Sequence, residues 1–141
     1  MDTRVELAVE KYKNGYNCAQ AIACTYCDLF DMDEREMFCM TEALGHGMGN
    51  MEGTCGAVSG ACVLAGLKGS TGNLEKPESK AKSYALSKAI MSGFKEKNQS
   101  VTCGGLKGVG TKVVLCSCPD CVRDAAILVE KILLEKEFVE N

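Results

Sequence analysis

The hydrophobic positions of this chain recur three and four residues apart in every long segment, which is the spacing of α-helices. Val5, Ala8, Val9 and Tyr12 share one face of a first predicted helix that ends near Lys13. The same spacing predicts further helices over residues 17–30, 34–44, 54–67 and 77–94 and after Pro119. Only residues 112–115, KVVL, suggest a brief strand. The pattern therefore predicts one all-α domain over residues 1–141, a compact bundle of about five to six helices.

Two glycine-rich segments interrupt these helices and are expected to form loops, GHGMGNMEG at 45–53 and CGGLKGVG at 103–110. Directly after the first, GTCGAVSGACVLAG (53–66) places small residues every four positions, so that they line one side of a helix. A glycine inside a helix costs roughly 0.5–1 kcal/mol relative to alanine. We therefore expect Gly56 and Gly60 to admit a close neighbour, either another helix of this chain or a second copy in a homodimer.

Composition and charge narrow the class of protein. The 141 residues are 46% hydrophobic and carry a net charge of −3 with dispersed lysine and arginine, so a nucleic-acid-binding face is not expected. The N-terminus lacks the apolar stretch of a secretory signal, and the longest apolar run (57–67) is shorter than the about 20 residues that span a bilayer. We expect a cytoplasmic protein without membrane contact. In a reducing compartment, 10 cysteines indicate metal, cluster or redox chemistry rather than a disulfide scaffold.

Three groups of cysteines stand out by their positions. Cys55 falls in the first turn of its predicted helix, where unpaired N–H groups and the helix dipole favour a thiolate. Cys118 and Cys121 form a C-x-x-C at a helix start, which resembles a redox dithiol locally, and Cys116 extends it to C-x-C-x-x-C, which also suits iron or zinc. Cys103 opens the second glycine-rich segment, whose backbone N–H groups either approach its sulfur or simply form a turn.

The remaining cysteines and the single histidine have simpler interpretations. Free cysteine often behaves as a small buried hydrophobe, and we expect this of the four within predicted helices, Cys24, Cys27, Cys39 and Cys62. His46 is interpreted as a surface residue of the first glycine-rich loop. The chain has no C-x-x-C-H motif, so haem is not expected.

Four features of the sequence form one pattern: GYNCAQAI at 15–22, TCGAVSGACVLAGLKG at 54–69, Cys103 before Gly-Gly-Leu, and Cys121 at the head of the last helix. This pattern resembles that of the C_GCAxxG_C_C family. The resemblance implies a small helical protein with a redox role, and it singles out Cys18, Cys55, Cys103 and Cys121. The cysteine module is also similar to that of split-Soret-type cytochromes, which carry haem and an iron–sulfur centre, although their haem attachment motif is missing here.

Three hypotheses for the function follow. The first is an electron-transfer protein in which Cys18, Cys55, Cys103 and Cys121 bind an iron–sulfur cluster. The second is metal-free thiol–disulfide exchange by Cys118 and Cys121, or by Cys55 with a partner thiol. The third is a structural zinc site or a helical interaction module. The sequence does not identify the redox partner that the first two hypotheses require.

Overall fold

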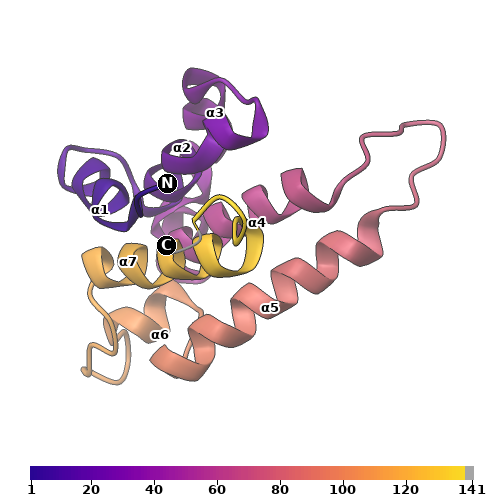
Figure 1. Cartoon of the computed structure of the whole chain (residues 1–141). Coiled ribbons are helices and arrows are strands. Elements are labelled where there is room, and N and C mark those ends of the chain that lie inside the picture. Colours follow the sequence, from indigo (N-terminus) through magenta and orange to yellow (C-terminus); the bar gives the residue numbers. More distant parts are fainter. Residues whose placement is uncertain (139–141) are drawn as a thin grey trace.

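The computed structural model describes residues 1–138 and consists mainly of helices (Figure 1). Within these residues seven α-helices follow one another: α1 (Val5–Lys13), α2 (Cys18–Tyr26), α3 (Glu34–Thr41), α4 (Gly56–Gly69), α5 (Lys80–Asn98), α6 (Cys103–Lys107) and α7 (Cys118–Leu128). Short 3-10 or π-type segments extend or precede several of them: η1 (Cys27–Phe30), η2 (Glu42–Leu44), η3 (Gly47–Met51) and η4 (Val129–Leu133). The predicted all-α fold is thereby confirmed.

The helix beyond the expected five to six is α6, which occupies the first half of the second glycine-rich segment. Its start is fixed by Thr102, whose hydroxyl accepts a hydrogen bond from the N–H of Gly105 at 3.3 Å. Residues 112–115 form no strand, so that prediction was wrong. Val113 and Val114 instead lie exposed in the loop between α6 and α7, where no neighbouring segment pairs with them in the described part of the chain.

Two helix starts also differ from the sequence prediction. Helix α5 begins at Lys80, so Pro77 belongs to the linker before it rather than to its first turn. Helix α4 begins at Gly56, with Cys55 rather than Thr54 as the N-cap. Thr54 pairs with Thr102 in an isolated antiparallel bridge, because its backbone is extended there.

Helix α4 packs against α2, α5 and α7, and its small residues explain how α2 approaches so closely. A Cβ atom added at Gly60 would lie 2.6 Å from the carbonyl oxygen of Ala19, and one at Gly56 would lie 3.2 Å from the backbone nitrogen of Ala19. The backbone of α2 therefore rests directly on the glycine face of α4. The close neighbour that the sequence predicted is a helix of the same chain.

Helices α4 and α5 form a hairpin whose linker, residues 70–79, projects away from the other helices (Figure 1). The second half of α5 buries Ile90 and Phe94 in the core, whereas Tyr84 in its first half is 68% exposed. Helices α2, α6 and α7 each begin with a cysteine, and none of the three belongs to this hairpin.

A buried polar contact ties the two ends of the chain together. The hydroxyl of Tyr26 donates a hydrogen bond to the carboxylate of Glu130, which also accepts one from the backbone N–H of Arg4 at 2.9 Å. Arg4 in turn forms an ion pair with Asp28 at 2.6 Å. Across residues 1–138, none of the helices combines the length and apolar character needed to cross a membrane.

Candidate functional site

A pocket of about 400 Å³ lies where several helix starts meet, and four cysteines line it. Cys18 is the first residue of α2, Cys55 is the N-cap of α4, Cys103 is the first residue of α6 and Cys118 is the first residue of α7. Tyr12 of α1, His46, Met51 and Lys107 complete much of its wall. The fold therefore gathers sulfur atoms from four separate parts of the sequence.

Local capping fixes two of these helix starts. Asn17 forms a capping box with Gln20: the Asn17 side chain accepts from the N–H of Gln20, and the Gln20 side chain accepts from the N–H of Asn17. Ser117 caps α7 by accepting a hydrogen bond from the N–H of Asp120 at 3.3 Å. Cys18 and Cys118 each follow such a cap directly, so the backbone position of each is set by its own helix.

Two extended segments hold Cys55 beside Cys103. The N–H of Cys55 donates to the carbonyl of Val101 at 2.7 Å, and the N–H of Cys103 donates to the carbonyl of Gly53 at 2.9 Å. The bridge between Thr54 and Thr102 lies between these two hydrogen bonds. Residues 53–55 and 101–103 thus run antiparallel. This pairing fixes the position of the start of α4 relative to the start of α6.

The first glycine-rich loop closes over Cys103. Gly47 has φ of +58°, and a Cβ added to it would lie 2.4 Å from the Cβ of Cys103. Only glycine meets both conditions without strain. The preceding residue, His46, also has a positive φ of 56° and lines the pocket with an exposed side chain. The loop therefore brings the single histidine of the chain to the cysteine pocket.

Cys18 and Cys118 form the first pair of interacting thiols. Cys18, Lys107 and Tyr12 line the pocket together with Cys118, and their side chains act on its sulfur as hydrogen-bond donors in its titration. These three donors lower the pKa of Cys118 to about 4, although burial acts in the opposite direction. The same interaction raises the pKa of Cys18. In this pair Cys118 is the thiolate and Cys18 keeps its proton.

Cys55 and Cys121 form the second pair. The interaction with the Cys121 side chain lowers the pKa of Cys55 to about 7 against the effect of burial, and the backbone N–H groups of Ala57 and Val58 act in the same direction. The interaction raises the pKa of Cys121, which is fully buried. Both pairs therefore combine a stabilised thiolate with a thiol that retains its proton.

Lys107 is a cation whose charge acts on the sulfurs at the pocket. Besides its effect on Cys118, its ammonium group donates to the carbonyl of Cys116 at 3.1 Å. The loop after α6 folds back because the N–H groups of Leu115 and Cys116 both donate to the carbonyl of Leu106, at 2.9 and 3.3 Å. This fold places Cys116 against Cys121, whose sulfur contacts the Cys116 carbonyl at 3.8 Å.

The structure thus brings all five sequence-selected cysteines into one region, with Cys18, Cys55, Cys103 and Cys118 at the pocket and Cys121 behind them. Side-chain interactions join each cysteine of the C-x-x-C to a partner outside that motif. Sequence reasoning did not select Lys107, Tyr12 or His46 as pocket residues. Nothing in their spacing marks them, because each comes from a different element.

The other cysteines lie away from this pocket. Cys24 and Cys27 are buried in a small cluster with Met37, as expected of core residues. Cys39 is exposed on α3, so the expectation that it is a core residue was wrong. Cys62 is half-buried, interacts with the side chain of Ser87 and lines a separate apolar hollow.

The donor types around the pocket, which are thiols beside backbone N–H groups and one cation, are the types that a sulfur-ligated, anionic cluster uses. Within residues 1–138, no group of three or more Cys, His, Asp or Glu side chains is placed to hold a single metal ion.

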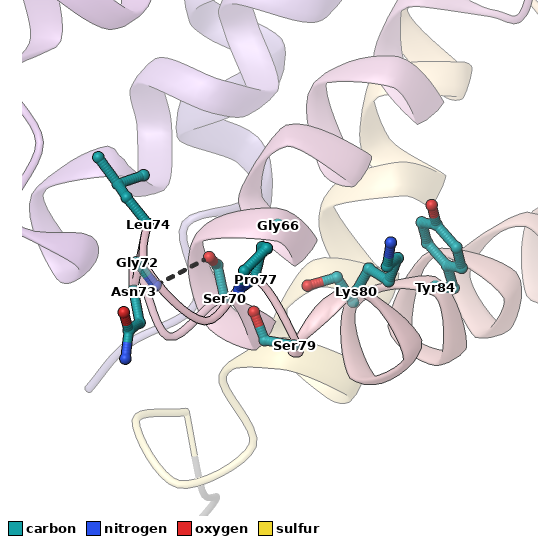
Figure 2. Close-up of a pocket in the computed structure, with 10 residues that line it drawn as sticks. Gly66, Ser70, Gly72, Asn73, Leu74, Pro77, Ser79, Lys80 and Tyr84 are labelled. Atoms are coloured by element: carbon teal, nitrogen blue, oxygen red, sulfur yellow. Dashed lines mark hydrogen bonds between the residues drawn. The ribbon is translucent and has the colours of Figure 1, made fainter.

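A separate hollow of about 390 Å³ lies between the end of α4, the linker and the start of α5, and Figure 2 shows that no cysteine lines it.

Comparison with known proteins agrees with the cysteine pattern. No curated protein and no solved structure matches the chain. A family model described as "Putative redox-active protein (C_GCAxxG_C_C)" matches residues 16–132, which include every cysteine at the pocket. The resemblance seen in the sequence is confirmed by this match. The chain belongs to the C_GCAxxG_C_C family.

Proposed function

We propose that this chain carries out thiol–disulfide exchange, with Cys118 as the attacking thiolate and Cys18 as the resolving thiol. The observation that carries the proposal is that Cys18 and Cys118, each the first residue of its helix, line the wall of one pocket. Both side chains are half-buried rather than sealed in the core, so a substrate disulfide can reach them. Lys107 and Tyr12 stabilise the negative charge that Cys118 must carry to attack.

The reaction balances with a disulfide as the oxidant. The Cys118 thiolate attacks one sulfur of the substrate disulfide, forms a mixed disulfide and releases one substrate thiolate. Cys18 then attacks the sulfur of Cys118 and gives up its proton, and the second substrate sulfur leaves. The products are a Cys18–Cys118 disulfide, one substrate thiolate and one substrate thiol that carries the proton of Cys18, so two electrons pass from the protein to the substrate. Lys107 stabilises the charge of Cys118 before the attack and takes no part in bond making.

The test uses bis(2-hydroxyethyl) disulfide with the fully reduced chain under anaerobic conditions. We expect a Cys18–Cys118 disulfide in the peptide map and two small thiols released for each one formed. In Cys18→Ser the reaction should stop at a mixed disulfide on Cys118, because the resolving sulfur is missing. Cys62→Ser, which changes a thiol outside the pocket, serves as the control and should react like the wild type.

Two results would contradict this proposal. One is a wild-type chain in which Cys18 and Cys118 are never linked, and the other is a Cys18→Ser variant that accumulates no adduct at Cys118. Either would mean that the pairing of these two cysteines has no role in exchange.

A second candidate function is electron transfer through an iron–sulfur cluster, favoured by the convergence of four helix starts on one pocket. When bound, such a cluster would supply one-electron transfer. Cys18, Cys55 and Cys103 would hold it together with Cys121 or Cys118. The backbone N–H groups of Ala57 and Val58 and the cation of Lys107 would stabilise the ligand sulfurs.

Cys103 separates the two candidates, because exchange between Cys18 and Cys118 does not use it whereas a four-cysteine cluster would. Iron and sulfide are measured in anaerobically purified chain, and metal analysis in the same sample also detects zinc. A cluster predicts bound iron that Cys103→Ser loses, with Cys118→Ser and Cys121→Ser identifying the fourth ligand. A wild-type chain free of iron that also fails reconstitution would contradict the cluster.

A further inference from the structure

We propose that Cys55 and Cys121 form a second redox pair, buried behind the first, which becomes oxidised by internal exchange with the Cys18–Cys118 disulfide. This inference rests on the proposed exchange activity and extends it from one disulfide to two. The fully reduced chain would then hold four transferable electrons in two dithiol pairs and would react with two substrate disulfides in succession.

The arrangement of the second pair supports a redox role without direct access to solvent. Cys55 and Cys121 lie in the same buried core cluster, and their side chains act on each other. Cys121 is fully buried and Cys55 is 4% exposed. A disulfide in solution can therefore reach Cys118 in the open pocket far more readily than it can reach the second pair.

Cys18 provides the path between the pairs. A Cβ added at Gly56, the residue after Cys55, would lie 3.2 Å from the Cβ of Cys18. Cys18 and Cys55 also line the same pocket, and their charges act on each other. The absence of a side chain at Gly56 thus lets Cys18 lie against the start of α4, in the pocket that Cys118 also lines.

The geometry favours attack by Cys55 on the Cys18 side of the first disulfide, because Cys18 lies against the residue that follows Cys55. Cys118 then leaves as a thiolate. A Cys18–Cys55 disulfide forms in this step. Cys121 next attacks the sulfur of Cys55, and Cys18 leaves and takes up the proton that Cys121 gives up.

Atoms, protons and electrons balance over these two steps. At the start, the chain holds a Cys18–Cys118 disulfide, a Cys55 thiolate and a Cys121 thiol. At the end, it holds a Cys55–Cys121 disulfide, a Cys118 thiolate and a Cys18 thiol. One negative charge has moved from Cys55 to Cys118, one proton has moved from Cys121 to Cys18, and the first pair is ready for another substrate.

The test follows disulfides over time in the full-length chain, fully reduced and then exposed anaerobically to excess bis(2-hydroxyethyl) disulfide. Samples are quenched with acid, alkylated and mapped by mass spectrometry. We expect the wild type to form the Cys18–Cys118 disulfide first and the Cys55–Cys121 disulfide after it, so that four of its 10 thiols are lost. In Cys121→Ser the intermediate should be trapped as a Cys18–Cys55 disulfide, with Cys118 free.

Cys18→Ser is the second variant, and it removes the path while leaving the second pair intact. The Cys55–Cys121 disulfide should then fail to form in the time that the wild type needs. Cys39→Ser, which changes an exposed thiol on α3, is the matched control and should keep both disulfides.

The outcomes distinguish two things: the internal exchange that passes oxidation from the first pair to the second (the relay), and the exchange activity on which it rests. If Cys18–Cys118 forms while Cys55 and Cys121 remain thiols, the relay is overturned and the exchange proposal stands. If Cys18→Ser forms Cys55–Cys121 as fast as the wild type, the second pair is oxidised directly and the relay is again overturned. If Cys18–Cys118 never forms, both proposals fail.

Discussion

Cys18 and Cys118 line the same pocket and act on each other's pKa, although one is the first residue of α2 and the other the first residue of α7. Lys107 acts on the sulfur of Cys118 from the end of α6. The interaction gives the two cysteines opposite roles, since one sulfur keeps its proton and the other carries the negative charge. The first two predictions below depend on this difference.

Cys118 should remain reactive at acidic pH. Its pKa is lowered to about 4 by the Cys18 thiol, Lys107 and Tyr12, so its thiolate is already present well below the free-cysteine value of about 8.5. With iodoacetamide and the reduced chain, its alkylation rate should stay level from pH 8 to pH 6. In the urea-unfolded chain the same site should slow about tenfold per pH unit below its pKa. Equal slopes in the folded and unfolded chains would contradict the prediction.

Replacing Lys107 by methionine should raise the pKa of Cys118, because the thiolate loses a neighbouring cation while the apolar stem is kept. Loss of an opposite charge at this range moves a titration by about one to three pH units. The midpoint of Cys118 alkylation against pH is the measurement. Lys68→Gln, an exposed lysine at the end of α4, should leave that midpoint unchanged. A midpoint that is the same in both variants would rule out a charge effect of Lys107.

Gly60→Ala should destabilise the fold because its new Cβ would meet the carbonyl oxygen of Ala19 at 2.6 Å. Inserting a group into so close a contact costs about 1–3 kcal/mol. Gly66→Ala in the same helix has no neighbour within 4 Å and should gain up to about 1 kcal/mol from helix propensity. Urea unfolding of the reduced chain measures both free energies. Similar values for the two variants would show that α2 does not rest on Gly60.

Tyr26→Phe should destabilise the fold through its buried partner, the carboxylate of Glu130. Removing a hydrogen bond to a charged group costs about 1.5–3 kcal/mol. Tyr16→Phe removes a similar bond to Glu34 at the surface, where water replaces the donor, and should cost less than about 1 kcal/mol. Thermal or urea unfolding distinguishes the two, and an equal loss would contradict the role assigned to burial.

Much of the fold could be predicted because it depends on local patterns. Helical spacing of hydrophobic residues located six of the seven α-helices of residues 1–138, and the capping residue Asn17 located the start of α2. The seventh, α6, was missed because CGGLK has a loop-like composition and depends on the Thr102 cap and on its pairing with residues 53–55. The start of α5 was misplaced because Pro77 suits a linker as well as a first turn.

The candidate site was predicted in its cysteines but not in their pairing. Spacing along the chain suggested that Cys118 acts with Cys121, because the two are three residues apart at a helix start. In the fold, Cys118 interacts with Cys18 and Cys121 interacts with Cys55. Which thiols meet depends on how α2, α4 and α7 pack. The spacing of residues along the chain does not reveal that packing.

The sequence alone determined that the chain is helical, that small residues line one helix, and that Cys18, Cys55, Cys103 and Cys121 match a redox family. These properties follow from the spacing of hydrophobic and small residues and from short sequence motifs, which are visible without the fold. Only the tertiary structure decided that the glycine face receives α2 and that the cysteines converge beside Lys107 in two interacting pairs. The reason is that a thiol's partner and charge are set by what surrounds it in space, and those neighbours come from distant parts of the chain.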